Sequence, residues 1–202
     1  MNSVIYLKAM TDPSVAPCFV LVDLQMEYIS GARLMAMPEA SAVLANCRLA
    51  LAHARAMGFP VAYVRQKSRS SFFNPATTFF SWISGFEPTR ADMVFDRDKP
   101  SCYSNGLFSE LMEGSEGHFV LAGFAGETAC LSTAIDAYHR SHRFTYLADA
   151  SASHGLGRLS ADQVQEAITE IIGTYGEILD TRSWITTTSN CAALPIGDRN
   201  GP

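Results

Sequence analysis

Short apolar runs alternate along this chain with longer segments in which apolar residues recur at helical spacing. The runs are continuous rather than alternating, which is typical of strands buried on both faces of a parallel sheet. Repeated strand–helix units predict a three-layer α/β/α sandwich with a mostly parallel sheet of five or six strands. The expected strands cover residues 18–22, 60–64, 91–95, 118–122, 143–147 and 177–180.

Two of the intervening segments carry clear helix signals. Residues 38–57 are rich in alanine, and Gly58 ends the pattern as a C-terminal glycine commonly does. Ser160 and Gln163 have the spacing of a capping box, so another helix is expected to begin there. The threonine-rich tail that ends at Pro202 carries no site signal.

The segment 118–136 joins an expected strand to a helix through a turn of small residues. Thr128 is the expected N-cap of this helix, which places residues 129 and 130 in its first turn. A helix N-terminus offers free N–H groups and a positive dipole end, so it stabilises developing negative charge and suits acyl-transfer chemistry. The expected buried face of the helix carries Leu131, Ala134, Ile135 and Tyr138.

The composition is that of an ordinary globular chain. Of its 202 residues 48% are hydrophobic, and we expect one domain spanning residues 1–202. No apolar run approaches the roughly 20 residues of a membrane span, and the first residues lack the pattern of a signal peptide. A net charge of −5 argues against a nucleic-acid partner. Five scattered cysteines, none in a C-x-x-C pair, are expected to be reduced thiols in a cytoplasmic protein.

Two charged residues follow expected strands and are candidates for chemistry. Asp23 lies directly after the first strand, at the sheet edge where open α/β proteins bind ligands. Lys99 follows the third strand in a charged loop. A solvated strand-end carboxylate and a surface lysine are the simpler alternatives. No His/Asp cluster has metal-ligand spacing, so neither a catalytic metal nor another cofactor is predicted.

A long aromatic loop spans residues 70–90. Long loops inside compact domains are commonly functional lids or interfaces, so this loop is expected to form a substrate wall or a contact between subunits. Its aromatic residues are Phe72, Phe73, Phe79, Phe80, Trp82 and Phe86.

The central turn resembles the active-site turn of the isochorismatase-like cysteine hydrolases, the superfamily that includes nicotinamidases and N-carbamoylsarcosine amidases. The family pattern is roughly G-x-x-T-x-x-C-V-x-x-T-A-x-D-A, with the cysteine as nucleophile. From Gly123 onward this chain keeps the first G, the later T-A and the D-A, whereas Gly126 replaces the first T. In this register the nucleophile position falls on Ala129, and Cys130 follows it.

Two further segments support the resemblance, which covers residues 17 to about 186 and implies the superfamily's three-layer fold. Asp23, Gln25 and Tyr28 are similar to the family's D-x-Q-x-x-[FY]. Lys99 and the residues after it resemble K-x-x-x-S-A-F more loosely, because residues 103–105 read Y-S-N.

The resemblance implies roles for these positions. Asp23 would be the general base, Lys99 its cationic partner and residue 129 the nucleophile, with the N–H groups of Ala125 and Ala129 as the oxyanion hole. A non-proline cis peptide bond would join Phe124 to Ala125. The expected substrate-binding residues are Tyr28, Phe72, Trp82 and Tyr103.

Ala129 cannot act as a nucleophile. The alanine would replace a cysteine, as in an engineered inactive variant, or a register slip would bring Cys130 into its place. A slip needs an insertion before Cys130 and a deletion after it, and one helical position turns a side chain by about 100°. The gapless register with Ala129 at the nucleophile position is therefore favoured.

The leading hypothesis is a hydrolase of a small-molecule amide that acts through a Cys-Asp-Lys type site and a thioester. One alternative is an isochorismatase-type vinyl-ether hydrolase in which Asp23 acts without a thiol. Another is a non-catalytic member of the family that binds a metabolite or a partner. The family also implies a homo-oligomer, a dimer or a tetramer, without a membrane or nucleic-acid partner.

Overall fold

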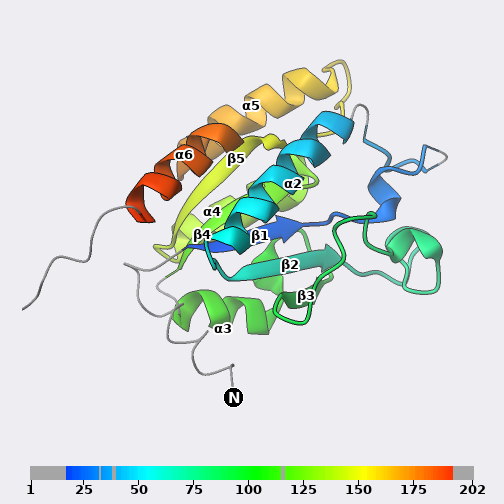
Figure 1. The fold of residues 1–202 in the computed structure, drawn as a ribbon. Coiled ribbons are helices and arrows are strands. Elements are labelled where there is room, and N and C mark those ends of the chain that lie inside the picture. The colour runs from blue at the N-terminus through cyan, green and yellow to red at the C-terminus, as the bar shows by residue number, and fades with distance from the viewer. Residues whose placement is uncertain (1–16, 32, 38–39, 115–116, 193–202) are drawn as a thin grey trace, which may run out of the picture.

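The computed structural model describes residues 17–31, 33–37, 40–114 and 117–192. Within these ranges six strands form one parallel sheet in the order β3-β2-β1-β4-β5-β6, which confirms the predicted fold class (Figure 1). The strands are β1 (Cys18–Val22), β2 (Val61–Gln66), β3 (Met93–Arg97), β4 (His118–Gly123), β5 (Arg143–Ser151) and β6 (Glu177–Leu179).

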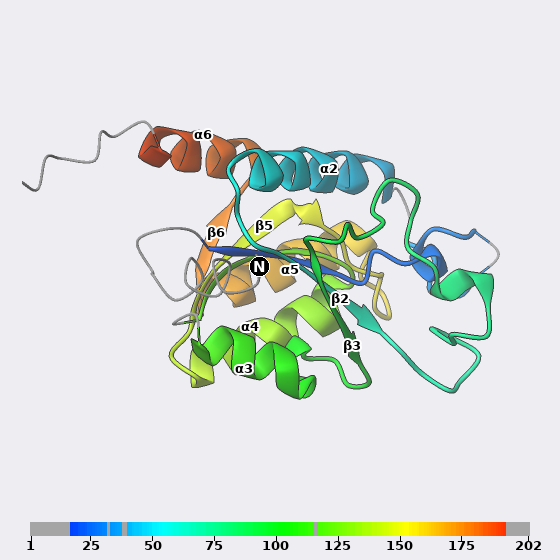
Figure 2. The same cartoon turned by 60° about the horizontal axis from the view of Figure 1, so that its bottom comes forward.

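Helices cover both faces of the sheet (Figures 1 and 2). On one face lie α2 (Ala40–Ala56) and α6 (Thr181–Ala192), and on the other lie α3 (Gly106–Gly114), α4 (Leu131–His139) and α5 (Ala161–Gly173). All five residues of β1 are buried and alternate between the two cores, so Phe19 and Leu21 pack under α2 while Val20 packs toward α4. Each fully buried aliphatic side chain contributes roughly 1.5–3 kcal/mol to folding.

Two helices and the bounds of several strands differ from the sequence expectations. Helices α3 and α6 were not anticipated, and β3 begins and ends two residues later than residues 91–95. The capping box at Ser160 is present, since its side chain accepts from the Gln163 N–H and the Gln163 side chain accepts from the Ser160 N–H.

The segment after β4 corrects the expected start of α4. Thr128 is not an N-cap, because residues 126–130 form a wide turn in which the Cys130 N–H donates to Ala125 O at 3.1 Å. This i to i+5 geometry changes the rotational phase of the helix that follows. Tyr138 is consequently 55% exposed instead of buried, and Thr133, Ala134 and Ala137 face the core.

The chain order places a topological switch point at the carboxyl ends of β1 and β4, in the middle of the sheet. The chain leaves β1 toward β2 and β3 on one side and returns through β4, β5 and β6 on the other. Val22 and Gly123, the last residues of β1 and β4, are paired. Ligands bind at such a topological switch point in open α/β sheets. None of the helices in the described ranges is long and apolar enough to cross a membrane.

Candidate active site

Asp23 lies at the switch point, directly after β1. Its backbone has a φ of 53°, in the left-handed region that aspartate tolerates better than most residues, and its side chain is fully buried. The turn after β4 packs against it closely. A Cβ on Gly123 would lie 2.1 Å from Val22 O, so only glycine fits where the two strand ends meet. Both backbones are therefore shaped to bring Asp23 beside the turn.

Asp23 forms a buried ion pair with Arg97, the last residue of β3. The Arg97 Nη2 donates to Asp23 Oδ2, and the two side chains are 1% and 0% exposed. The Arg97 Nη1 donates to the backbone oxygen of Lys99 at 2.6 Å. Lys99 itself is exposed. The structure thus brings Asp23 together with Arg97, and Lys99 contributes its carbonyl rather than its ammonium group.

Burial decides the protonation behaviour of this pair. It raises the pKa of Asp23 from 3.8 to about 6, although the charge of Arg97, the backbone at Gln66 and the nearby Tyr28 act to lower it. Burial also opposes the charge on Arg97, but Asp23 keeps the pKa of the guanidinium above its usual value. A guanidinium stays charged in proteins, so Asp23 is the member of the pair that exchanges protons.

The turn after β4 presents backbone amides and a methyl group near Asp23. The peptide bond between Phe124 and Ala125 is cis, as expected. Ala129 is fully buried. Within the described ranges, the Ala125 N–H has no acceptor. The turn therefore offers a backbone donor without an acceptor in these ranges, and the side chain at position 129 offers no nucleophile.

The two cysteines nearest the ion pair are both buried thiols. Burial raises the pKa of Cys130 well above 9.0, and its Sγ contacts Gly123 O at 3.8 Å. Burial raises the pKa of Cys102 to about 11 against the opposing charge of Arg97. The Cys102 N–H donates to Thr133 Oγ1 at 3.0 Å, which fixes the start of its short helix. Neither sulfur has the lowered pKa of a nucleophilic cysteine.

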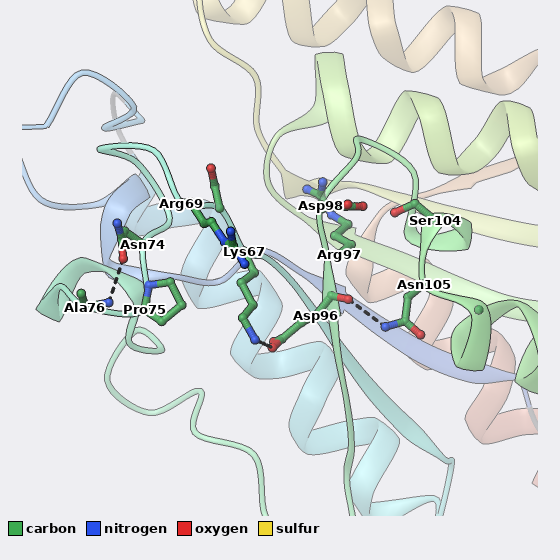
Figure 3. Close-up of a pocket in the computed structure, with 12 residues that line it drawn as sticks. Lys67, Arg69, Asn74, Pro75, Ala76, Asp96, Arg97, Asp98, Ser104 and Asn105 are labelled. Carbon is green, nitrogen blue, oxygen red and sulfur yellow. Dashed lines mark hydrogen bonds and ion pairs between the residues drawn. The ribbon is translucent and has the colours of Figure 1, made fainter.

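A cleft of about 850 Å³ lies beside the ion pair, at the carboxyl ends of β2 and β3 (Figure 3). Arg97 belongs both to the pair and to the wall of the cleft. The Lys67 Nζ meets Asp96 Oδ2 at 3.0 Å, and the Asn105 Nδ2 donates to Asp96 O at 2.7 Å. The full lining is Lys67, Ser68, Arg69, Asn74, Pro75, Ala76, Asp96, Arg97, Asp98, Ser104, Asn105 and Gly106.

Comparison with known protein families identifies the family to which the chain belongs. A family profile described as the Isochorismatase domain matches residues 17–183. The chain belongs to the isochorismatase family. This membership confirms the resemblance drawn from the sequence and indicates a hydrolase. A search of curated proteins finds no match.

Solved structures of the family share the fold. An isochorismatase from Pseudomonas putida KT2440 is 25% identical with a TM-score of 0.77, over 85% of this chain and 91% of that one. A cysteine hydrolase from Pseudomonas syringae pv. phaseolicola 1448A is 20% identical with a TM-score of 0.80, over 89% and 95%. An isochorismatase-like hydrolase from Alkaliphilus metalliredigens is 14% identical with a TM-score of 0.75, over 86% and 99%.

Arg97 is the ion-pair partner of Asp23 that the sequence interpretation missed. The family segment K-x-x-x-S-A-F also fits residues 97–103, with arginine in place of lysine, S at Ser101 and the aromatic residue at Tyr103. Ser101 supports this register structurally, because its side chain caps the short helix at residues 102–104 by accepting from the Tyr103 N–H at 3.2 Å. Ser101 was therefore the signal in the sequence for Arg97. Matching the lysine of the family segment to Lys99 obscured that signal.

The expected substrate-binding residues lie outside the lining of the cleft. Tyr28 is buried beside Asp23, with its ring against Phe73 and Phe124. The remaining three also have protein partners: Phe72 lies under Arg33, Trp82 against Tyr63, and the Tyr103 hydroxyl meets His142 Nδ1 at 2.7 Å. His142 precedes β5, so the Tyr103 hydroxyl lies toward the amino ends of the strands, at the opposite end from Asp23. In the described ranges no group of three or more His, Cys, Asp or Glu could hold a metal ion.

Proposed function

We propose that this protein is an isochorismatase-type hydrolase of small vinyl ethers in which Asp23 donates the proton and no thiol takes part. The observation that carries the proposal is the pairing of a methyl group at position 129 with a buried Asp23 whose pKa is raised to about 6. A raised pKa near neutrality is what a general acid needs. Nucleophilic catalysis would instead need a thiolate, and neither nearby cysteine favours that form.

The reaction can be written with this chain's own groups. The protonated Asp23 carboxyl transfers its proton to the terminal carbon of the vinyl ether, and positive charge develops on the ether carbon. Water adds to that carbon and returns a proton to the Asp23 carboxylate. The hemiketal then collapses to a ketone and an alcohol. Arg97 holds the carboxylate in place between the two proton transfers.

Turnover of vinyl ethers by the unsubstituted protein tests this proposal. Isochorismate and simpler enol ethers are supplied, and release of the ketone product is measured between pH 5 and 8. We expect turnover that Asp23→Asn lowers by at least about a hundredfold, since an acid–base group contributes roughly 10²–10⁴-fold. Asp162→Asn removes the same charge from an exposed position on α5 and serves as the control. Turnover that survives in Asp23→Asn would overturn the role of this carboxyl.

Amide hydrolysis is the second candidate, and the turn after β4 favours it. The Ala125 N–H has no acceptor among the described residues, so it is available as an oxyanion-hole donor for acyl transfer. Ammonia or amine release by the unsubstituted chain, lost in Cys130→Ala, would favour this candidate. Silence in both assays would favour the non-catalytic member that binds a metabolite.

A further inference from the structure

The residues of the candidate active site are closed off from solvent. Asp23, Ala125 and Ala129 are each at most 1% exposed. Tyr28, which lies beside Asp23, is buried to the same degree. The cleft offers no way in, because the Arg97 side chain in its wall is itself buried. A small molecule can therefore reach Asp23 only if a covering segment of the chain moves.

The ring of Phe73 covers Tyr28 from the aromatic loop. The two ring centroids lie 5.2 Å apart, and Phe73 is buried although its two neighbours in the chain are not. The next residues, 74–76, line the cleft (Figure 3). One short stretch of chain therefore forms a wall of the cleft and also covers the tyrosine beside Asp23.

The backbone of Phe73 has an unfavourable conformation. Its φ of 53° lies in the left-handed region, where a bulky side chain is an outlier because its Cβ crowds the backbone carbonyl oxygen. Such residues persist only where surrounding contacts hold them, and they cluster at ligand clamps and switch regions. Here the ring packs on Tyr28, and the Phe73 N–H donates to Glu27 Oε2 at 3.4 Å. Movement of the ring away from Tyr28 releases the backbone from this conformation, which favours opening.

Arg33 fastens the same loop to the segment after β1. Its guanidinium pairs with the buried carboxylate of Glu27 at 2.6 Å and donates to Ser71 O. The rings of Phe72 and Phe79 lie against the guanidinium, with centroids 5.3 and 4.5 Å away. All these contacts with the loop are made by one long side chain, so its release would free the loop.

We infer that residues 70–76 form a flap and that Phe73 is the gate through which substrate reaches Asp23. The inference rests on the site of the proposed function and supplies its access route. In the closed position the Phe73 ring seals Tyr28. In the open position the ring leaves Tyr28, and the cleft beside residues 74–76 becomes continuous with the space around Asp23. Closure over a bound substrate then shields proton transfer from bulk water.

Modification of Cys130 measures this opening in the unsubstituted protein. Its thiol is buried and interacts electrostatically with both Tyr28 and Asp23. Methyl methanethiosulfonate is added at pH 8, and peptide mass spectrometry gives the rate of modification of each cysteine. Cys18 in β1 and Cys47 in α2 are buried elsewhere and serve as references for global unfolding. We expect Cys130 to react at least tenfold faster than both references, because the flap opens while the core stays folded.

Variants of the loop identify the gate. Phe73→Ala removes the ring and should raise the rate at Cys130 at least tenfold, with the two reference thiols unchanged. Phe72→Ala is the matched control, since that ring lies against Arg33 and not against Tyr28, and it should change the rate less than threefold. Arg33→Gln releases the loop and should raise the rate at least threefold. It keeps the Phe73 ring, so it decides the matter if Phe73→Ala fails to fold.

A Cys130 rate equal to those of the references, or unchanged in Phe73→Ala, would overturn the inference. Equal gains from Phe73→Ala and Phe72→Ala would also overturn it. The labelling requires no turnover, so it separates the gate from the proposed reaction. Selective labelling of Cys130 without vinyl-ether cleavage would keep the gate and reject the reaction. Cleavage with Cys130 no faster than the references would keep the reaction and reject the gate.

Discussion

Arginine at position 97 limits what the partner of Asp23 can do. A buried lysine can lose its proton and take part in proton transfer, whereas a guanidinium stays charged and acts through its field and its fixed donors. In this chain the guanidinium is held at two points, by Asp23 Oδ2 and by Lys99 O. Arg97 is therefore a positioning and charge-balancing residue, and proton exchange is left to Asp23.

Removing each of the two cations in turn should separate their roles. Arg97→Ala leaves the Asp23 carboxylate buried without its partner, which costs about 3–5 kcal/mol of the free energy of unfolding. Lys99→Ala keeps the backbone oxygen that binds Arg97, so we expect a change within about 0.5 kcal/mol. Urea unfolding monitored by circular dichroism measures both. Equal losses in the two variants would return Lys99 to the role that the sequence suggested.

Position 129 should accept a nucleophile if the turn is competent for acyl transfer. Ala129→Cys places a thiol in the buried turn after β4, and we expect amine release from at least one of nicotinamide, carbamoyl-amino acids, ureas and aromatic amides. The gain over the unsubstituted chain should be at least about 10³-fold, because a nucleophile, its base and its oxyanion hole act as a unit. Adding Asp23→Ala should abolish the gain, and a chelator should not.

Cys130→Ala in the Ala129→Cys background is the matched control for this variant. Cys130 is buried with its sulfur against Gly123 O, so its removal should leave amine release largely intact. Activity that depends on Cys130 instead would show that the gapless register is wrong. A folded Ala129→Cys protein that is silent across the panel would reject the amide hydrolase hypothesis.

At the scale of elements, His154 ties the active-site turn to two other segments. Its Nδ1 faces Glu127 Oε1 at 2.8 Å, and its Nε2 faces Met35 O at 3.0 Å. Its backbone N–H also donates to Glu127 Oε2 at 3.3 Å. Acceptors on both ring nitrogens favour the imidazolium form. The hydrogen bond to Glu127 accordingly raises the pKa of His154, although burial opposes the rise.

Removal of this link should loosen the turn in a pH-dependent manner. We expect His154→Ala to lower the free energy of unfolding by about 1–3 kcal/mol at pH 6, the range for a hydrogen bond to a charged group. Because the folded pKa lies above the unfolded value of 6.5, the stabilisation is full below 6.5 and is lost as the pH rises through the folded pKa.

Urea unfolding at pH 6 and pH 9 measures the effect, with His139→Ala, exposed on α4, as the control. A loss that is larger at pH 9 than at pH 6 would contradict the imidazolium at position 154.

At the scale of elements, a buried strand could be predicted from its continuous apolar run. A helix could not be predicted where few of its side chains face the core. All five residues of β1 are buried, so its apolar run could be recognised directly. Helix α6 is rich in threonine and buries little besides Trp184, which stacks on Phe19 at 5.4 Å, so no helical periodicity was visible. The end of β3 was placed two residues early, which left Arg97 outside the expected strand, and the lysine of the family segment was matched to Lys99.

At the scale of the whole molecule, the fold was predictable and the charge arrangement was not. The three-layer sandwich follows from repeated strand–helix units, and the position of Asp23 follows from the end of β1. The partner of Asp23 depends on how far β3 extends and on which face its last side chain lies. Those are tertiary properties, and the local signal for Arg97 was the serine at position 101, which fits the family segment from Arg97 and not from Lys99.

Asp23 should also leave a signature on the stability of the whole molecule. Its folded pKa of about 6 lies above its usual value of 3.8, so the folded state binds a proton more tightly than the unfolded chain. The resulting stabilisation is fully present below about pH 3.8 and is lost as the pH rises through about 6. A difference of about two pKa units corresponds to about 3 kcal/mol.

Other groups titrate in the same range, and the lowered pKa of Asp96 acts in the opposite direction, so wild type must be compared with a variant. Asp23→Asn cannot titrate at this position. The stability of wild type relative to Asp23→Asn should therefore increase by about 2.4 kcal/mol between pH 7 and pH 4, measured by urea unfolding at each pH. Asp162→Asn, exposed on α5, should show no such change relative to wild type. A wild-type advantage that shrinks as the pH falls would mean that Arg97, and not burial, dominates the carboxyl, and Asp23 would then be a poor proton donor near neutral pH.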